Sequence, residues 1–202
     1  MTQNRTFHNR KYPRASWHDY SGGTYFVTVC TKEQRCTLGS VQNRRMIRSC
    51  IGEFLDFNLL NIGIHQPDVQ IPVHTVMPNH FHALIIIDGC LPNNTLSQFA
   101  YSSDSQRKFI GKGDVRDSLG VVVGGIKSAV TRFARKQGLD FGWQPRYYDH
   151  IVRTWSEYDN ISNYILTNVE TWESDCFHVL PHWHIGIGIN APDYLYWYCI
   201  SM

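Results

Sequence analysis

The chain has 202 residues, 43% of them hydrophobic, and a net charge of +2, which predicts one main soluble domain around a single core. No stretch approaches the ~18 apolar residues of a membrane-spanning helix, the polar and basic start does not resemble a signal peptide, and the six cysteines include no C-x-x-C pair. These features argue against a membrane-spanning protein or a disulfide framework, and we expect a cytoplasmic protein with free thiols and no membrane partner.

The positive charge is concentrated in two segments. Residues 1–50 carry nine Lys and Arg against two acids, and residues 101–150 carry nine against five. Residues 1–22 form a basic arm with interleaved aromatic side chains, a composition suited to nucleic-acid phosphates and stacked bases but equally found in an unstructured terminus. Together the two segments predict either one phosphate-binding surface or an ordinary solvated surface.

Hydrophobic periodicity predicts seven elements. Strands are expected where β-branched and aromatic residues are dense, and helices where apolar residues recur every three or four positions. Pro78-Asn79 is interpreted as the turn that joins two strands of a hairpin. The predicted strands are Thr24–Thr31, Val69–Val76, His80–Ile87 and Tyr147–Val152, and the predicted helices are Asn43–Asn61, Leu119–Gln137 and Glu157–Trp172.

The order of these elements is β-α-β-β-α-β, followed by one more helix. It predicts an α+β fold with a ferredoxin-like antiparallel sheet and helices on one face, plus a C-terminal helix that carries a tyrosine. Residues 89–116 lack periodicity and are expected to form a loop or insertion. No pattern places the tail at 174–202.

His80 and His82 open a strand that continues as an unbroken apolar run. Because side chains alternate across a strand, both imidazoles are expected on one face and Phe81 on the other. Two neutral imidazoles at a strand end are typical of half a metal site, and also of histidines held by ordinary hydrogen bonds.

Tyr164 and Asn168 are four residues apart on the last predicted helix, so they are neighbours on one surface. Combined with the two histidines they suit phosphodiester chemistry. His80, His82 and Asn168 would bind a divalent cation that polarises a phosphate, and Tyr164 would attack the phosphorus to form a covalent phosphotyrosine. This exchange needs no nucleotide hydrolysis, which fits the absence of a phosphate-binding G-x-x-x-x-G-K-[ST] loop.

Five segments together resemble the REP-associated tyrosine transposases, relatives of the single-tyrosine insertion-sequence transposases. The resemblance covers about Lys11 to Trp172. The segments are G-T-Y-F-V-T-V-C-T (23–31), V-M-P-N-H-F-H-A-L-I-I-I (76–87), G-G-I-K-S-A-V-T-R (124–132), W-Q-P-R-Y-Y-D-H-I-V-R (143–153) and N-Y-I-L-T-N (163–168).

The resemblance implies that His80 and His82 are the ligands of a His-hydrophobe-His motif, that Asn168 is the third ligand, and that the metal is Mg²⁺ or Mn²⁺. It implies that Tyr164 becomes linked to the 5′-phosphate of cleaved single-stranded DNA. Family members commonly have Pro after the helix Asn, whereas Val169 stands here, and the helix is expected to continue through it.

The resemblance also implies a domain organisation and a partner. The division is a basic arm at 1–22, a catalytic domain at 23–173 and the tail at 174–202. The partner is single-stranded or hairpin DNA from repeats, which would make the protein nucleoid-associated, and its state as monomer or homodimer stays open. The candidate DNA contacts are Arg10, Lys11, Arg14, Lys127, Arg132, His150 and Arg153.

Several alternatives stay open. The protein could bind DNA hairpins without cutting them, or it could be a metal-dependent phosphodiesterase that uses water. The second would need a carboxylate near the metal, and the candidate strands offer only Asp88 and Asp149. The rival nucleophiles are Tyr147, Tyr148 and Tyr158. A second candidate metal site, for zinc, comprises Cys176, His178, His182 and His184.

Overall fold

The computed structural model describes residue 20 and residues 22–87 and 119–178. Most of the predicted arm, nearly all of the predicted insertion and the tail beyond residue 178 lie outside these described residues. No helix in the described ranges is long and apolar enough to cross a lipid bilayer. The candidate residues outside the described part of the chain are Arg10, Lys11, Arg14, Asp88, His182 and His184.

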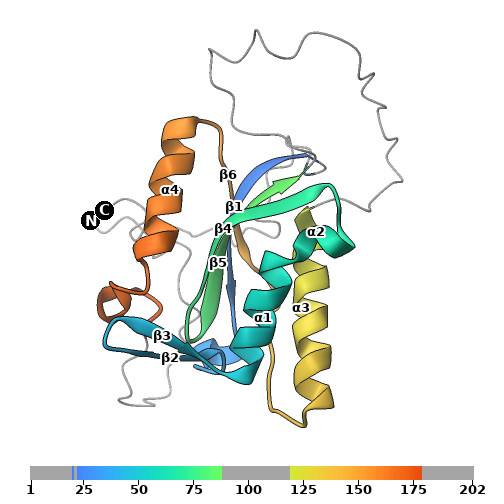
Figure 1. The fold of residues 1–202 in the computed structure, drawn as a ribbon, viewed down its shortest axis with the longest axis vertical. Coiled ribbons are helices and arrows are strands. Elements are labelled where there is room, and N and C mark those ends of the chain that lie inside the picture. The colour runs from blue at the N-terminus through green and yellow to red at the C-terminus, as the bar shows by residue number, and fades with distance from the viewer. Residues whose placement is uncertain (1–19, 21, 88–118, 179–202) are drawn as a thin grey trace, which may run out of the picture.

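A four-stranded antiparallel sheet forms the centre of the molecule (Figure 1). Its strands lie in the order β4 (Val69–Val76), β5 (His80–Ile87), β1 (Gly23–Cys30) and β6 (Tyr148–Ile151). Of these four strands, β1 and β5 are central and β4 and β6 are the edges. In chain order, the first and third strands of this sheet are therefore the central ones. This is the ferredoxin-like order, so the predicted fold class is confirmed.

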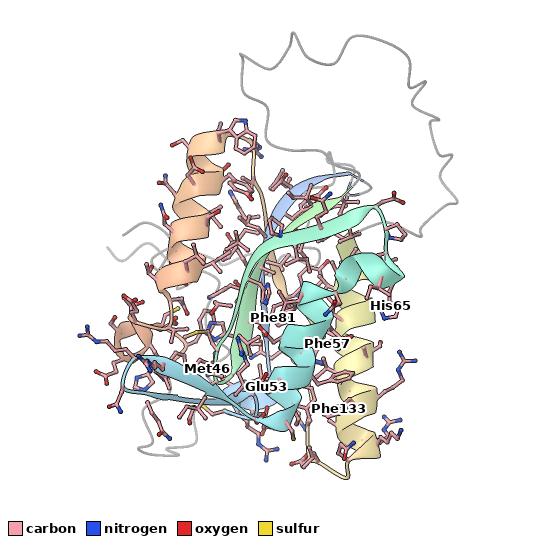
Figure 2. The ribbon with its side chains drawn as sticks, viewed as in Figure 1. Met46, Glu53, Phe57, His65, Phe81 and Phe133 are labelled. Carbon is pink, nitrogen blue, oxygen red and sulfur yellow. The ribbon has the colours of Figure 1, made fainter. Side chains whose placement is uncertain are left out.

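Two long helices and one short helix cover one face of the sheet (Figure 1). They are α1 (Cys50–Leu60), α2 (Ile62–His65) and α3 (Leu119–Lys136). The core on this side consists of alternate strand residues and the apolar stripes of the helices, as the period of two in strands requires. Phe81 of β5 lies in this core, and Phe133 of α3 stacks on Phe54 with ring centroids 4.1 Å apart (Figure 2).

The opposite face of the sheet is covered by α4 (Trp155–Thr167) (Figure 1). Ile161 and Ile165 of α4 pack on Phe26 of β1 and Leu84 of β5. Because both faces are buried, β5 has no exposed residue, which explains its continuous apolar sequence. The sheet therefore separates an α1–α3 side from an α4 side.

A hairpin precedes α1 and was not predicted. Its strands are β2 (Gly39–Gln42) and β3 (Arg45–Arg48), so the predicted helix Asn43–Asn61 is wrong over its first seven residues. Asn43 and Arg44 have φ angles of 51° and 60°, which are typical of a two-residue hairpin turn. Met46, whose spacing favoured a helix, lies on the hairpin instead (Figure 2). The helix starts only after Ser49, whose side chain accepts a hydrogen bond from the Gly52 N–H.

The last helix ends earlier than predicted. Asn168 caps α4, so the expected continuation of the helix through Val169 is wrong. The chain turns there and forms a short 3₁₀ helix at Trp172–Ser174. The turn lets Trp172 and Phe177 bury themselves against the end of the sheet, and this packing outweighs the helical spacing of the sequence.

Candidate metal and tyrosine site

The site is built around His80 and His82, the first and third residues of β5. They lie opposite Cys30 and Thr28 of β1, on the α4 side of the sheet, while Phe81 points to the other side. Both histidines are buried, with His80 0% and His82 1% exposed. Their Nε2 atoms are 3.0 Å apart, so the two imidazoles converge on one point.

Asn79 fixes the protonation of His80. Its Nδ2 donates to the carbonyls of Gln34 and Phe177, at 3.2 and 2.8 Å, which leaves Oδ1 to face His80 Nδ1 at 2.8 Å. An amide oxygen only accepts, so Nδ1 of His80 carries the proton and Nε2 keeps a lone pair, which faces His82 Nε2. The other ring has a similar support, since His82 Nδ1 lies 2.8 Å from Thr28 Oγ1. Such outer hydrogen bonds are typical of histidines that bind metals.

Tyr164 reaches the histidines from α4. Its hydroxyl lies 3.3 Å from His82 Nε2. The ring of Phe26 stacks on His82 and meets the edge of the Tyr164 ring, with centroids 5.4 and 6.1 Å away. The structure thus brings the predicted phenol and both predicted imidazoles together within one chain.

Asn168 lies at the same end of α4 and is 2% exposed. Its Nδ2 donates to Asp175 Oδ2 at 3.0 Å, and its buried Oδ1 finds no hydrogen-bond partner among the described residues. A buried carbonyl oxygen left unpaired needs an explanation, and an ion is one of the few available. Asn168 is linked to the histidines through Asp175, and its unpaired Oδ1 is an oxygen of the type that binds divalent cations.

Asp175 is a residue that the sequence analysis missed. Its carboxylate and the ring nitrogens of His80 and His82 offer ligand atoms that all lie within 4.8 Å of one another. Of the two strand carboxylates that the sequence offers, Asp149 sits opposite Val27 and so lies on the α1–α3 side of the sheet. No local spacing in the sequence indicates Asp175, because the turn after α4 brings it back to the sheet.

Burial sets the charge of these groups. It lowers the pKa of His82 from 6.5 to about 3, and burial together with the neighbouring His82 holds the pKa of His80 well below 6.5. Burial also raises the pKa of the Asp175 carboxyl, although hydrogen bonds from Phe177 and Asn168 oppose this shift. Both imidazoles are thus neutral at pH 7, the state in which they bind cations, and the donor set fits a divalent metal.

The rival tyrosines lie elsewhere. Tyr147 packs against the core on the α1–α3 side of the sheet. Tyr148 lies on the α4 side, but burial and the charges of Asp149 and Glu157 raise its pKa to about 12, which makes its phenolate harder to form. Tyr158 lies near the start of α4, with its ring 5.5 Å from that of Trp155.

A basic groove lies on the α1–α3 side of the sheet. It has a volume of about 600 Å³, and its cationic lining residues are Lys127, Arg132 and Arg135 of α3. Lys127 Nζ donates to the carbonyl of Gln144 at 2.6 Å, and Trp143 Nε1 donates to the carbonyl of Lys127 at 3.1 Å. Among the described residues, none that lines this groove is acidic.

The basic groove and the histidines lie at the same end of the sheet. Trp143, which lines the groove, forms an isolated bridge with Thr31, the residue after β1. The Thr31 N–H in turn donates to the carbonyl of Asn79 at 2.8 Å, next to His80. The two features therefore sit back to back, one on each face of the sheet.

The other predicted DNA contacts flank the start of α4. His150 Nε2 lies 2.5 Å from Glu157 Oε1, and the Arg153 N–H donates to Glu157 Oε2 at 2.8 Å. Of the second candidate metal site, Cys176 and His178 are described. His178 packs on Trp172, with ring centroids 5.0 Å apart.

Comparisons with known proteins give a sequence relative and a structural neighbour. No family model matches the chain. A REP-associated tyrosine transposase bound to a REP hairpin is structurally similar, with 18% identity and a TM-score of 0.48 over 82% of this chain and 76% of that one. An uncharacterized protein of Haemophilus influenzae is 32% identical over 179 residues, which is 87% of this chain and 97% of the relative. This chain therefore belongs to the same family as the Haemophilus influenzae protein.

Proposed function

We propose that this protein cleaves and rejoins single-stranded or hairpin DNA through a covalent 5′-phosphotyrosine on Tyr164. A divalent cation, Mg²⁺ or Mn²⁺, would be held by His80, His82 and Asn168. The observation that carries the proposal is the 3.3 Å between the Tyr164 hydroxyl and His82 Nε2, beside a second neutral imidazole. The choice of DNA rests on the five sequence segments and on the basic groove.

Each residue has a defined part in the reaction. A cation bound here would polarise the scissile phosphate and offset its charge. The Tyr164 oxygen forms a bond to phosphorus as the bond from phosphorus to the 3′ oxygen breaks. Overall the phenolic proton is transferred to the 3′ oxygen, which leaves as a hydroxyl. Attack by a 3′ hydroxyl reverses the step, so the phosphodiester energy is conserved.

The surroundings hold these groups in position. Phe26 packs against the rings of both Tyr164 and His82, which restricts how the phenol turns toward the imidazole. Asn79 keeps the Nε2 lone pair of His80 available. Because Tyr164 and His82 of one chain already lie 3.3 Å apart, the proposed chemistry needs no tyrosine from a partner subunit.

The basic groove is proposed to bind the DNA backbone. Lys127, Arg132 and Arg135 present three cations in one open groove, which is the chemistry that phosphates require. Contacts of this kind position the nucleic acid without reading its sequence. The further proposed contacts are Arg10, Lys11, Arg14, His150 and Arg153.

One observation favours a second candidate, a metal-dependent phosphodiesterase that uses water. Such an enzyme needs a carboxylate near the metal, and Asp175 supplies one within 4.8 Å of the histidine nitrogens. In that case the strand is cut without becoming attached to Tyr164. The two functions therefore differ in the fate of the DNA end.

The test is a cleavage assay with a DNA hairpin that has a single-stranded flank, in the presence of Mn²⁺. Wild type should give a DNA–protein adduct that survives a denaturing gel, and Tyr164→Phe should give none. Tyr158→Phe, the same change on the same helix, should keep the adduct. Released fragments without an adduct would identify the phosphodiesterase, and binding without cleavage would identify a hairpin-binding protein.

A further inference from the structure

The turn that follows α4 places a carboxylate against the histidine pair. Asp175, His80 and His82 offer ligand atoms that all lie within 4.8 Å of one another. Donors that share one cation at about 2.1 Å lie roughly 3 Å apart when adjacent and roughly 4.2 Å apart when opposite. The three groups therefore lie close to the spacing that donors to one shared ion require.

Hydrogen bonds from the surrounding turn and from α4 orient this carboxylate. The Phe177 N–H donates to Asp175 Oδ1 at 2.7 Å, and Asn168 Nδ2 donates to Oδ2 at 3.0 Å. Both donors favour the ionised form, as does a hydrogen bond from the Cys176 side chain. The turn is itself tied to the histidine strand, since the Phe177 carbonyl accepts from Asn79 Nδ2 at 2.8 Å and the Phe177 ring lies 4.5 Å from that of His80.

Asp175 forms no ion pair with Lys or Arg among the described residues. The titratable groups around it are His178, which favours the ionised carboxylate, and the neutral imidazoles of His80 and His82 on the strand. A half-buried carboxylate in such a place is costly unless a cation or strong donors satisfy it. The unpaired Oδ1 of Asn168, the residue that holds Asp175, is a second sign that a group is accommodated here.

We propose that Asp175 is a ligand of the same divalent cation as His80 and His82, and that Asn168 positions its carboxylate. The inference rests on the proposed function, in which the histidines bind a cation. An anionic oxygen added to two nitrogens makes the site suited to hard ions such as Mn²⁺ and Mg²⁺. The cation also links the turn after α4 to the sheet.

The experiment measures Mn²⁺ binding by isothermal titration calorimetry, without DNA. Asp175→Asn should raise Kd by at least about tenfold, whereas Glu173→Gln, which removes the same charge from an exposed acid two residues earlier, should leave Kd unchanged. The visible absorption spectrum of bound Co²⁺ should change in Asp175→Asn, because the set of ligands changes. An unchanged Kd and an unchanged Co²⁺ spectrum would show that Asp175 only hydrogen-bonds to Asn168, and would overturn the inference.

Further outcomes separate this inference from the proposed function. If wild type binds no Mn²⁺, or His80→Ala binds it as well as wild type, the cation of the proposed function fails, and the role of Asp175 fails with it. If His80→Ala loses binding but Asp175→Asn keeps it, only the present inference fails. Should Asp175→Asn not fold, Asp175→Glu keeps the charge but moves the carboxylate by one methylene, and an unchanged Kd in that variant counts against the ligand role.

Discussion

Replacement of Asn79 by alanine should both destabilise the protein and weaken the proposed cation site. The side chain is 0% exposed and makes hydrogen bonds with three residues that are distant from one another. Alanine removes the donor to the Phe177 carbonyl and the acceptor for His80 Nδ1, both buried bonds of 2.8 Å. It also removes the longer bond to the carbonyl of Gln34, which is only partly buried.

The magnitude follows from the two fully buried groups. Each buried polar group left without a partner costs about 1–3 kcal/mol, so Asn79→Ala should lower the free energy of unfolding by about 2–6 kcal/mol. That is a large share of the ~5–15 kcal/mol that stabilises a typical domain. In the fraction that stays folded, His80 no longer has a fixed tautomer, and the affinity for Mn²⁺ should fall by about tenfold to a hundredfold.

Urea denaturation followed by circular dichroism measures the first effect, and calorimetric titration with Mn²⁺ measures the second. Asn160→Ala is the matched control, because Asn160 is an exposed residue of α4 and its replacement should change stability by less than about 0.5 kcal/mol. A loss below about 1 kcal/mol in Asn79→Ala, with unchanged Mn²⁺ affinity, would refute the reasoning. It would mean that water replaces the amide without cost.

Two glycines and the buried histidines give further predictions. Gly52→Ala should destabilise the protein by about 1–3 kcal/mol, because the new Cβ would meet the Leu38 carbonyl oxygen at 2.1 Å. Gly124→Ala on α3 meets nothing within 4 Å and should stabilise the protein by about 1 kcal/mol. Thermal unfolding of the two variants shows whether their changes in stability have opposite signs. Without a cation, the free energy of unfolding should fall as the pH drops below 6.5. Below that pH both imidazoles bind protons in the unfolded chain, whereas in the folded protein burial holds the pKa of His82 near 3 and that of His80 well below 6.5. In urea titrations the free energy of unfolding should change by up to about 1.4 kcal/mol per pH unit for each histidine. A free energy of unfolding that does not depend on pH would contradict this prediction.

The parts of the fold that could be predicted from the sequence are those with local signals. The strands Val69–Val76 and His80–Ile87 have the predicted bounds, because dense β-branched and apolar runs are typical of buried strands. The hairpin before α1 was missed because the R-M-I-R sequence of β3 also fits the spacing of the helix that follows. The signals against a helix were Asn43 in the turn and Ser49 as a cap.

Some features of the site could likewise be predicted from local sequence signals, and others could not. The shared face of His80 and His82 follows from the alternation of a strand, so it could be predicted. Asn79 was interpreted only as a turn residue, yet it is buried and bonds to Phe177, which is 98 positions away in the sequence. Asp175 enters the site through a turn stabilised by the burial of Trp172, and such tertiary packing leaves no periodic pattern in the sequence.

The back-to-back placement of the basic groove and Tyr164 has a consequence for the geometry of a substrate. A DNA molecule that contacts both must pass around the end of the sheet at Thr31. A duplex has a persistence length of about 150 base pairs and resists so sharp a turn, whereas an unpaired strand makes it easily. If the proposed function holds, this geometry sets a minimum number of unpaired nucleotides between a hairpin stem and the phosphate that is cut, and a substrate with a shorter spacer would be bound but left intact.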